Sequence, residues 1–517
     1  MATTPRPNRL RKSMIISTVA VLLVGAVALA LVWSHAHRIY GGYVEHVAAD
    51  RFGAEGERLA VTNVDVLSPD GERMLPGRLV VIDAGRITSI SRPGQVPPGA
   101  RVIDGTGHYL IPGLTDAHVH LRKQPNDLLL YVANGVTHVR DLAGSEADLV
   151  LREEIANGRI GPLLHVASPM LFNGGFAKRA LHSFTAPRQA AGAPERAEKL
   201  VASLVAAGYD ALKTYADLDL DTYRAINRVA STRGVYTIGH LPDGFDLEEL
   251  ASTEQREIAH IEELVKVLQF EFRAREAGDY ASEFPAFVAS RADAIIDALL
   301  ASDITVNSTL WMMENVGDQV FGLEEALRRL PLAYANPAMV EGSPFVRQFG
   351  WLPGRNQFEA PADTSAEERQ RIQALWDARA EAHRVLFRRM AQRGVRITAG
   401  TDATSHLVVP GFSMHDELAS LVRNGMTPAQ ALRAATATPA AILGSDDGVL
   451  DAGRRADLVL LRADPLEDIR NTRAIEAVVL NGRWLDRAEL DAMLDAVAAA
   501  HAASRNFDLA AYQQTAP

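Results

Sequence analysis

Leu110-Ile-Pro-Gly-Leu-Thr-Asp-Ala-His-Val-His120 is the stretch that decides the fold of this 517-residue chain. It has the form of a short apolar strand that ends in two histidines one residue apart. Side chains alternate between the two faces of a strand, so His118 and His120 point the same way and Val119 points the other way. Two imidazoles on one face at the end of a strand can ligate one divalent metal ion. A lone His-x-His pair is weak evidence, so the rest of the chain has to decide.

The middle of the chain alternates short apolar segments with helical ones, which is the pattern of parallel β/α units. Eight segments have the composition of strands: residues 113–120, 136–142, 163–168, 211–215, 235–241, 257–262, 304–310 and 396–403. They predict an α/β fold, namely a (β/α)8 TIM-like barrel over residues 112–440. In such a barrel the active site lies at the C-terminal ends of the strands.

Short strand-like segments also flank this middle part of the chain. They occupy residues 59–111 and 441–487, so we expect one small β-sandwich domain assembled from N- and C-terminal segments. Asp83-Ala-Gly85 and Asn481-Gly482 predict tight hairpin turns between pairs of these strands. Residues 488–517 have the composition of a C-terminal helix and tail.

The N-terminus contains an apolar run over residues 14–33 that follows four basic residues. A run of this length spans roughly 30 Å as a helix, the thickness of a bilayer core. We therefore expect residues 1–36 to form a cytoplasmic basic tail and a single transmembrane helix in the inner (plasma) membrane, followed by a linker over 37–58. The basic flank places the rest of the chain on the extracytoplasmic, periplasmic side. A cleaved signal peptide, with Ala28-Leu-Ala30 as the cleavage site and a protein secreted to the periplasm, is the competing interpretation.

The composition excludes several classes of site and partner. A formal net charge of −11 disfavours a nucleic acid partner. The chain has no cysteine, which rules out disulfides, thiolate metal sites and a cysteine nucleophile. Histidine and carboxylate side chains are therefore the ligands on which a metal site would depend.

Two regions are longer than ordinary loops, and we interpret them as insertions into the barrel. Residues 264–302 are helical and acidic in texture, whereas residues 311–367 carry five prolines and aromatic residues that include Phe345 and Phe349. Long aromatic insertions after barrel strands commonly form lids over an active site. An interface or a packing element explains the same composition equally well.

Residues able to bind a metal occur at the predicted C-terminal ends of five strands. They are His118 and His120 on the first strand, Lys213 on the fourth, His240 on the fifth, His260 on the sixth and Asp402 on the eighth. Each one alone has an ordinary explanation as a hydrogen-bonded histidine, a solvated lysine or a helix cap. Six such residues at one end of one barrel are hard to reach by chance, and together they predict a metal site.

These features resemble the amidohydrolase superfamily of metal-dependent hydrolases, over most of the chain from about residue 59 to residue 487. The stretches that carry the likeness are Leu110 to His120, Gly135-Val-Thr-His-Val-Arg-Asp141, Ile397-Thr-Ala-Gly-Thr-Asp402, Met426-Thr-Pro-Ala-Gln-Ala-Leu432, Ala456-Asp-Leu-Val-Leu-Leu461 and Val478-Val-Leu-Asn-Gly-Arg483. Within the superfamily the chain is most similar to imidazolonepropionase-like and prolidase-like members, which cleave amide-type C–N bonds.

The resemblance implies a site for two metal ions. Lys213 would be carboxylated by CO2, and the resulting carbamate would bridge the two ions. The implied ligand sets are His118, His120 and Asp402 for one ion, and His240 and His260 for the other. Histidine and carboxylate ligands suit Zn2+, with Mn2+, Fe2+ or Co2+ as alternatives, and members without the lysine function with one metal. A metal-activated hydroxide would attack a carbonyl, with Asp402 as the general acid/base.

Substrate contacts are less well marked in the sequence. Tyr215 lies two residues after Lys213 on the same strand face, where it would hydrogen-bond the oxyanion or a substrate carboxylate, although a core tyrosine is equally compatible. His406 and His415 follow the eighth strand, and both are candidates for the surroundings of the site. Of these two, His406 is the candidate substrate contact.

The chain departs from similar members in the loop after the third strand. This loop reads Phe172-Asn-Gly-Gly-Phe176, whereas similar members often have histidine after the glycine pair. Substrate contacts from this loop therefore do not follow from the resemblance. Arg347 and Arg355 in the second insertion are candidate ligands for a substrate carboxylate, with surface arginines as the alternative.

We therefore expect a metal-dependent amidohydrolase that hydrolyses a non-standard amide-type C–N bond in an N-acyl amino acid, a dipeptide or a cyclic amide. An Xaa-Pro dipeptidase or carboxypeptidase, or a lactone or ester hydrolase, is the alternative for the same site. A membrane-tethered binding protein on a hydrolase scaffold is the non-enzyme alternative, which the intact set of six residues disfavours. The expected partners are a small-molecule substrate and the membrane, and a homo-oligomer is compatible with the sequence.

Overall fold

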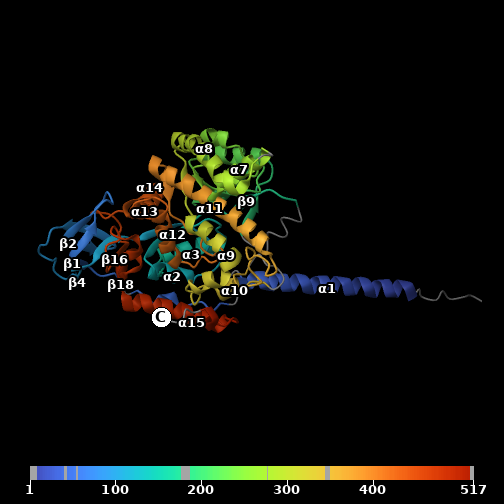
Figure 1. The fold of residues 1–517 in the computed structure, drawn as a ribbon. Helices are drawn as coiled ribbons and strands as arrows, with labels where there is room; N and C mark the ends of the chain where they lie inside the picture. Colours follow the sequence, from blue (N-terminus) through green and yellow to red (C-terminus); the bar gives the residue numbers. More distant parts are fainter. Residues whose placement is uncertain are drawn as a thin grey trace, which may run out of the picture.

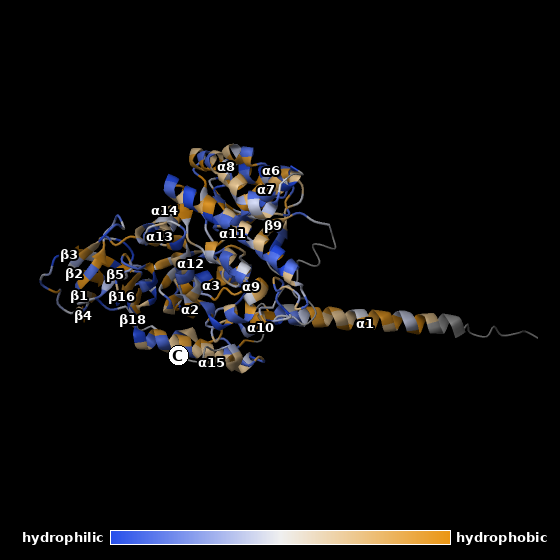
Figure 2. Cartoon of the chain, in the orientation of Figure 1, coloured by the Kyte–Doolittle hydropathy of each residue, from blue (hydrophilic) through white to orange (hydrophobic). Residues whose placement is uncertain are grey.

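The computed structural model describes residues 9–39, 44–53, 56–175, 187–275, 278–343 and 350–512. These residues form an α/β body from which one long helix, α1 (Arg9–Ile39), projects (Figure 1). Within these ranges α1 is the one helix that is long and apolar enough to cross a membrane, over Met14–Ile39. Its apolar side chains are exposed, and Figure 2 shows the helix as a hydrophobic rod outside the body. The helix continues past Trp33, where the sequence predicted the end of the membrane segment.

Strands from both ends of the chain share one eight-stranded sheet, in the order β18-β17-β16-β5-β1-β2-β3 with β4 beside β1. Their bounds are β1 (Leu59–Leu67), β2 (Met74–Asp83), β3 (Arg86–Ser91), β4 (Arg101–Asp104), β5 (Tyr109–Pro112), β16 (Leu458–Leu461), β17 (Ile475–Leu480) and β18 (Arg483–Asp486). The two halves meet where β5 pairs antiparallel with β16, with Leu110 opposite Leu460. β5 leads directly into the first barrel strand, so the sheet is joined to the barrel at the stretch that carries His118.

Both predicted hairpins are confirmed. β2 turns into β3 through Ala84 and Gly85, and β17 turns into β18 through Asn481 and Gly482. All four turn residues have positive φ angles between 48° and 77°. Type I′ turns need this conformation at both central positions, and their twist matches that of the flanking strands.

Eight parallel strands build a TIM-barrel-like core. They are β6 (Leu114–Val119), β7 (Val136–Asp141), β8 (Leu163–Val166), β11 (Ala211–Thr214), β12 (Tyr236–Gly239), β13 (Glu257–Ile258), β14 (Thr305–Asn307) and β15 (Ile397–Thr398). They pair as β6-β7-β8 and as β11-β12-β13-β14-β15, with β9 (Met170–Phe172) and β10 (Arg188–Ala190) beside β11. Bridges from Ala167 to Ala211 and from Val119 to Ala403 join the two groups at both seams. Each of the eight lies within a segment that the sequence predicted as a strand.

Helices between and after these strands cover the barrel. They are α2 (Asp127–Ala133), α3 (Glu146–Ala156), α5 (Ala197–Ala206), α6 (Leu220–Thr232), α7 (Ile261–Ala274), α8 (Tyr280–Ala301), α9 (Leu310–Arg328), α10 (Pro337–Glu341), α11 (Ala366–Arg393), α12 (Phe412–Arg423), α13 (Pro428–Ala434) and α14 (Ala437–Leu443). A last helix, α15 (Arg487–Ser504), packs against α2, β17 and β18. One large apolar core runs through both the barrel and the end sheet.

One predicted strand is much shorter in the structure, and both insertions are largely helical. The strand predicted over 257–262 ends at Ile258, because α7 begins at Ile261 and His260 is its N-cap residue. The first insertion consists largely of α7 and α8, and α8 packs along α11. Much of the second insertion is helical as well, in α9 and α10, whereas Phe345 and Phe349 lie outside the described residues.

Candidate metal centre

The six predicted ligands come from one end of the barrel. Asp402, which follows β15, lies next to His118, near the end of β6, and to His120, directly after β6. Its Oδ1 atom lies 3.0 Å from His120 Nε2 and 3.4 Å from His118 Nε2. The backbone brings them together as well, because the Asp402 amide donates to the His118 carbonyl at 2.8 Å. The first and last strands of the barrel are neighbours, which explains how residues far apart in sequence converge.

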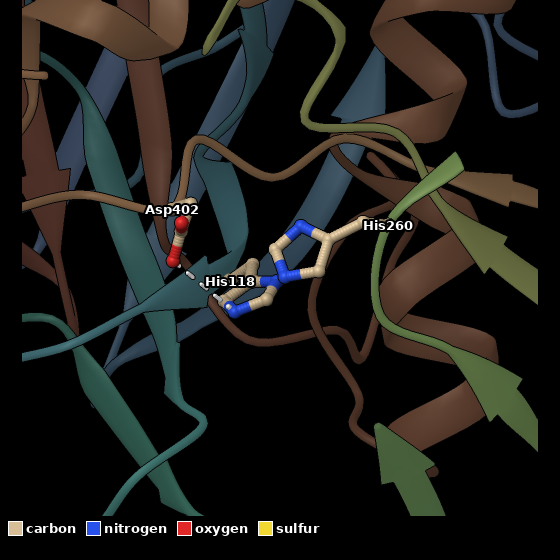
Figure 3. Close-up of side chains that lie close together, drawn as sticks. All are labelled: His118, His260 and Asp402. Atoms are coloured by element: carbon tan, nitrogen blue, oxygen red, sulfur yellow. Dashed lines mark ion pairs between the residues drawn. The ribbon is translucent and has the colours of Figure 1, made fainter. Parts of the chain in front are cut away.

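His260 and His240 extend this group along the barrel rim. Nitrogen and oxygen atoms of His118, His260 and Asp402 lie within 4.8 Å of one another, close enough to hold one ion (Figure 3). The His118 and His260 ring centroids are 4.5 Å apart, and those of His260 and His240 are 5.0 Å apart. Lys213, on β11, is close enough for its charge to act on His118, His260 and Asp402. The structure therefore brings all six residues together.

Two histidines are oriented by hydrogen bonds at Nδ1. His118 Nδ1 lies 3.1 Å from the carbonyl oxygen of Ala259, and His260 Nδ1 lies 2.9 Å from Thr309 Oγ1. A carbonyl only accepts, so the proton of His118 sits on Nδ1 and its Nε2 carries a lone pair that faces the group. Hydrogen bonding of the second ring nitrogen in this way is typical of metal-binding histidines.

His240 is held by a buried carboxylate on α7. Its Nδ1 lies 3.0 Å from Glu263 Oε1, while Glu263 Oε2 accepts from Lys266 Nζ at 2.7 Å and from the Leu241 amide at 2.9 Å. Burial raises the pKa of Glu263, but the adjacent His240 and Lys266 outweigh it and hold that pKa well below its usual value. The carboxylate is thus ionised and fixed, and it directs His240 Nε2 toward the centre.

Buried polar atoms without partners mark the centre itself. Among the described residues, His118 Nε2 and Lys213 Nζ are fully buried and have no hydrogen bond. Burial lowers the pKa of Lys213 to about 8, an effect that the nearby Asp402 and Glu263 carboxylates partly offset. Buried polar groups without partners are costly and rare in folded proteins. A cation between the imidazoles and an acidic group on Lys213 would satisfy both.

The protonation states suit a cation as well. Burial lowers the pKa of His118, of His120 and, to about 3, of His260, so these rings are neutral at pH 7. Burial raises the pKa of Asp402, but the adjacent His118 and His120 outweigh it and keep that pKa well below its usual value. Neutral imidazoles around an ionised carboxylate form a donor set that fits Zn2+ and the related divalent ions.

Asp402 is held in an uncommon backbone conformation. Its φ angle is +56°, in the left-handed region that residues other than glycine rarely adopt. Ser405 Oγ donates to Asp402 Oδ2 at 2.6 Å, so the carboxylate presents Oδ1 to the histidines. Conformations of this kind persist when the surroundings impose them, and they concentrate at functional sites.

Three carboxylates near the centre were not singled out from the sequence. Asp116 accepts from the Thr401 hydroxyl at 2.6 Å and ties β6 to the loop of Asp402. Asp141, at the end of β7, has Oδ1 4.0 Å from His120 Nδ1. Glu263, described above, is the third. Asp116 and Asp141 fall inside two of the stretches that carry the family resemblance, and this was the available signal. Glu263 follows His260 by three residues, which places it on the next helical turn.

Of the two predicted substrate residues, Tyr215 contacts a residue of the centre, and the printed contact of His406 is with the second insertion. The half-buried Tyr215 packs its ring against His240, with ring centroids 4.5 Å apart, and the Arg188 guanidinium lies over the Tyr215 ring, 4.6 Å from its centroid. Burial raises the pKa of Tyr215, so its hydroxyl remains a donor at neutral pH. His406 packs against Phe358 of the second insertion, with ring centroids 5.2 Å apart. Arg188 was not predicted from the sequence.

The prediction for His415 is wrong. Its Nδ1 lies 2.9 Å from Thr472 Oγ1, so α12 directs this side chain toward the C-terminal segment and not toward the centre. Arg355 donates to the Glu341 carbonyl at 2.7 Å and serves to hold the second insertion. Arg347 and Phe176 lie outside the described residues.

Comparisons with known proteins agree with this arrangement. The model of the amidohydrolase family matches residues 302–485, which include Asp402. An adenine deaminase of Chelativorans sp. (strain BNC1) is 33% identical over 119 residues, which is 20% of this chain and 20% of the deaminase. The structure of bottromycin amidohydrolase matches with a TM-score of 0.63 at 23% identity, over 90% of this chain and 96% of that chain. Residues 302–485 of the chain therefore resemble the amidohydrolase family.

The family match over residues 302–485 confirms, for that part of the chain, the resemblance predicted from the sequence. A Xaa-Pro dipeptidase with methionine bound in its active site also matches, with a TM-score of 0.59 at 17% identity over 83% of this chain and 100% of that one. At these identities the structural matches show a shared fold. The chain spans about a fifth of the length of the curated relatives it matches, so those local matches do not by themselves assign a substrate.

Proposed function

We propose that this protein is a metal-dependent amidohydrolase that hydrolyses a non-standard amide-type C–N bond. The observation that carries the proposal is the buried group in which His118 Nε2 and Lys213 Nζ make no hydrogen bond beside the ionised Asp402. Unsatisfied buried atoms beside an ionised carboxylate are expected where a bound cation supplies the missing contacts. The superfamily match and the names of the matched proteins, a deaminase, a dipeptidase and an amidohydrolase, support the same class of reaction.

The proposed ligands form two sets, one for each metal ion. His118, His120 and Asp402 would hold one divalent ion, and His240 and His260 the second. Lys213, as a carbamate formed with CO2, would reach both. When bound, such ions lower the pKa of a coordinated water and polarise a carbonyl. The ions are most simply two Zn2+, with Mn2+, Fe2+ or Co2+ as alternatives that the same ligands accept.

Side chains of the protein would supply the proton transfers and the orientation. Asp402 presents Oδ1 to the centre, so we assign it the role of accepting a proton from the attacking water and delivering it to the leaving nitrogen. Tyr215, protonated and packed on His240, is placed to donate to the substrate oxygen or to a substrate carboxylate. His406 is a second candidate contact. An N-acyl amino acid, a dipeptide or a cyclic amide has the groups that these roles require.

Metal analysis combined with a substrate screen tests the function. We expect the purified protein to contain divalent metal, to lose activity on exhaustive chelation and to regain it with Zn2+ or Mn2+. The screen compares N-acyl amino acids, Xaa-Pro dipeptides and lactones, because these separate an amidohydrolase from a dipeptidase and from an ester-type hydrolase. Full activity in metal-free protein would overturn the mechanism. Metal binding without turnover of any class would favour a binding protein.

The carbamate has its own test. Lys213→Ala leaves a gap near the cations in which acetate or propionate could replace the missing group, so we expect partial recovery of activity with either acid. Arginine cannot form a carbamate because the guanidinium stays protonated, so Lys213→Arg should be inactive. No rescue, together with a wild-type mass that lacks bound CO2 under gentle conditions, would leave the lysine without this role.

We also propose that α1 anchors the catalytic body on the extracytoplasmic side of a membrane. Its apolar, exposed surface and the basic residues that precede it in the sequence support this location. The full-length protein should float with membranes and keep residues 14–33 after maturation. A soluble protein whose N-terminus lies beyond residue 36 would show that the segment is a cleaved signal.

A further inference from the structure

The last turn of α1 differs from the rest of the helix because it is packed into the catalytic body. Ile39 is 4% exposed, whereas the side chain of Trp33 is still about half exposed. Asn336, which caps α10, donates to the Ile39 carbonyl at 3.1 Å. Arg38 donates to Glu341 Oε2 at 2.7 Å and to the Ser504 carbonyl at 3.3 Å. The helix therefore ends in a specific docking site.

Glu341 connects three distant parts of the chain at this site. It is a buried residue at the end of α10. Besides Arg38, it accepts from the Asn506 amide at 2.6 Å and from Asn506 Nδ2 at 3.2 Å. One carboxylate thus holds the membrane-proximal end of α1, the second insertion and the segment after α15. A buried carboxylate of this kind is costly to leave unpaired, so its partners are tightly coupled.

The segment that follows α1 is also packed against the body. Both polar atoms of the Asn126 side chain bind this segment. Its Oδ1 accepts from the Val47 backbone amide at 2.9 Å, and its Nδ2 donates to the Glu45 carbonyl at 2.9 Å. Phe52 is buried in the large core. The described part of the predicted linker over 37–58 is therefore fixed to the barrel and is not a loose tether.

The length of α1 places this docking site at the surface of the membrane. The apolar segment Met14–Ile39 has 26 residues, which span roughly 39 Å at about 1.5 Å rise per residue. A bilayer core takes up about 30 Å of this length, so the remainder reaches only into the headgroup layer. Arg38 and Glu341 would then lie at headgroup level, with no length left for a spacer.

The docking site lies on the same face of the barrel as the metal centre. Val340 of α10 lies in one buried apolar cluster with Leu407 and Val409, which belong to the segment that follows Asp402 after β15. Figure 1 shows α1 leaving the body on the side of α10 and β9, while the sheet of β1, β2 and β16 lies at the opposite end. An anchor docked in this way turns the catalytic face toward the bilayer.

We propose that Arg38, Glu341 and Asn506 clamp the anchor to the catalytic body and hold the face that carries the metal centre against a lipid surface. The partner of this face is the headgroup layer of the membrane in which α1 sits. The proposal rests on the membrane location proposed above. It does not depend on which bond the centre hydrolyses, so orientation is measurable without a substrate.

Site-specific fluorescence quenching in vesicles tests this orientation. The chain has no cysteine, so a single introduced cysteine carries a single fluorophore. Gln357→Cys labels an exposed position next to Phe358 in the second insertion, and Val102→Cys labels an exposed position on β4 in the distant sheet. The full-length protein is reconstituted into phosphatidylcholine vesicles whose headgroups carry a nitroxide quencher. We expect the label at 357 to be quenched several-fold more than the label at 102.

Variants of the clamp complete the test. Glu341→Gln and Arg38→Ala should each reduce the difference between the two labels, because the body can then rotate about the end of α1. Glu325→Gln, the same change at an exposed position on α9, is the matched control and should leave the difference intact. Thermal unfolding in detergent confirms that each variant is folded. Equal quenching of both labels in the wild type, a difference that neither clamp variant alters, or failure to float with vesicles would overturn the proposal.

Discussion

Two buried basic residues of the barrel differ in how their side chains are hydrogen-bonded. Arg140 on β7 and Lys213 on β11 are both about 1% exposed. Arg140 makes two hydrogen bonds to Glu257, at 2.8 and 2.5 Å, and a third to the Ala117 carbonyl at 2.8 Å. Tyr236 donates to the same Glu257 carboxylate at 2.8 Å. Lys213 Nζ, in contrast, has no hydrogen bond among the described residues.

The difference in hydrogen bonding distinguishes a structural layer of the barrel interior, around Arg140, from a functional layer, around Lys213. The Arg140 group lies immediately below the rim, since Ala117 precedes His118 and Glu257 precedes His260 by three residues. Its polar atoms are satisfied by the protein itself, so it stabilises one arrangement of strands. The atoms at the rim are left incomplete, which is the state expected where a ligand supplies the missing contacts. Substitutions in the Arg140 group should therefore change the free energy of unfolding, and substitutions at the rim should change activity or metal binding.

Asp402→Asn should have the largest effect, and on activity alone. The amide keeps the shape of the side chain and one coordinating oxygen but cannot accept a proton. We expect kcat to fall by roughly 10²–10⁴, with metal content and the free energy of unfolding close to those of the wild type. Turnover of a substrate found in the screen, measured beside metal content, checks this. Near-normal turnover in the metal-loaded variant would assign the proton transfer to another residue.

Arg140→Met should have the opposite profile. It leaves Glu257 buried without its cation, so we expect the free energy of unfolding to drop by about 3–5 kcal/mol. Urea unfolding of the detergent-solubilised protein measures the loss. The double variant Arg140→Met/Glu257→Met removes both charges and should recover much of the stability. A single variant as stable as the wild type would show that the lower layer does not support the fold.

Glu263→Gln should weaken metal binding without touching the metal. The neutral amide holds His240 less firmly and makes it a weaker donor, so we expect affinity to fall by roughly 10- to 100-fold. Competition with a chromophoric chelator measures the change. Lys266→Met removes only the partner of Glu263 and should have a smaller effect in the same direction. Unchanged affinity in Glu263→Gln would mean that His240 needs no support from α7.

Lys213→Met should stabilise the metal-free protein, by about 0.5–2 kcal/mol, because it replaces an unpartnered buried amine with an apolar side chain of similar shape. Burial lowers the pKa of Lys213 to about 8 from 10.5, so the unfolded chain binds more protons between these values. Wild-type stability therefore rises with pH in this window, and the advantage of the variant shrinks. Unfolding at pH 7 and pH 9.5 tests both statements. A variant less stable than the wild type at pH 7 would show that the amine has a partner.

Local sequence patterns were sufficient to bring the six candidate ligands to one end of the barrel. Barrel strands are recognisable in the sequence as short apolar runs. A polar residue at the C-terminal end of such a run lies on the active-site face of the barrel. For this reason the sequence alone predicts His118, His240 and Asp402 as neighbours at this face. It also explains the error at His415, which follows the eighth strand in sequence but lies on a helix whose orientation is a matter of tertiary packing.

The sequence by itself determined the barrel, the sheet shared by both ends, the apolar N-terminal helix and the six residues at the rim, because each depends on periodicity or on strand order. Only the tertiary structure decided which side chains support them. The bonds from Glu263 to His240, from Ala259 to His118 and from Arg38 to Glu341 are made between separate elements. Such contacts depend on how separate elements pack against one another, and the distance between two elements is not encoded in the pattern of either one.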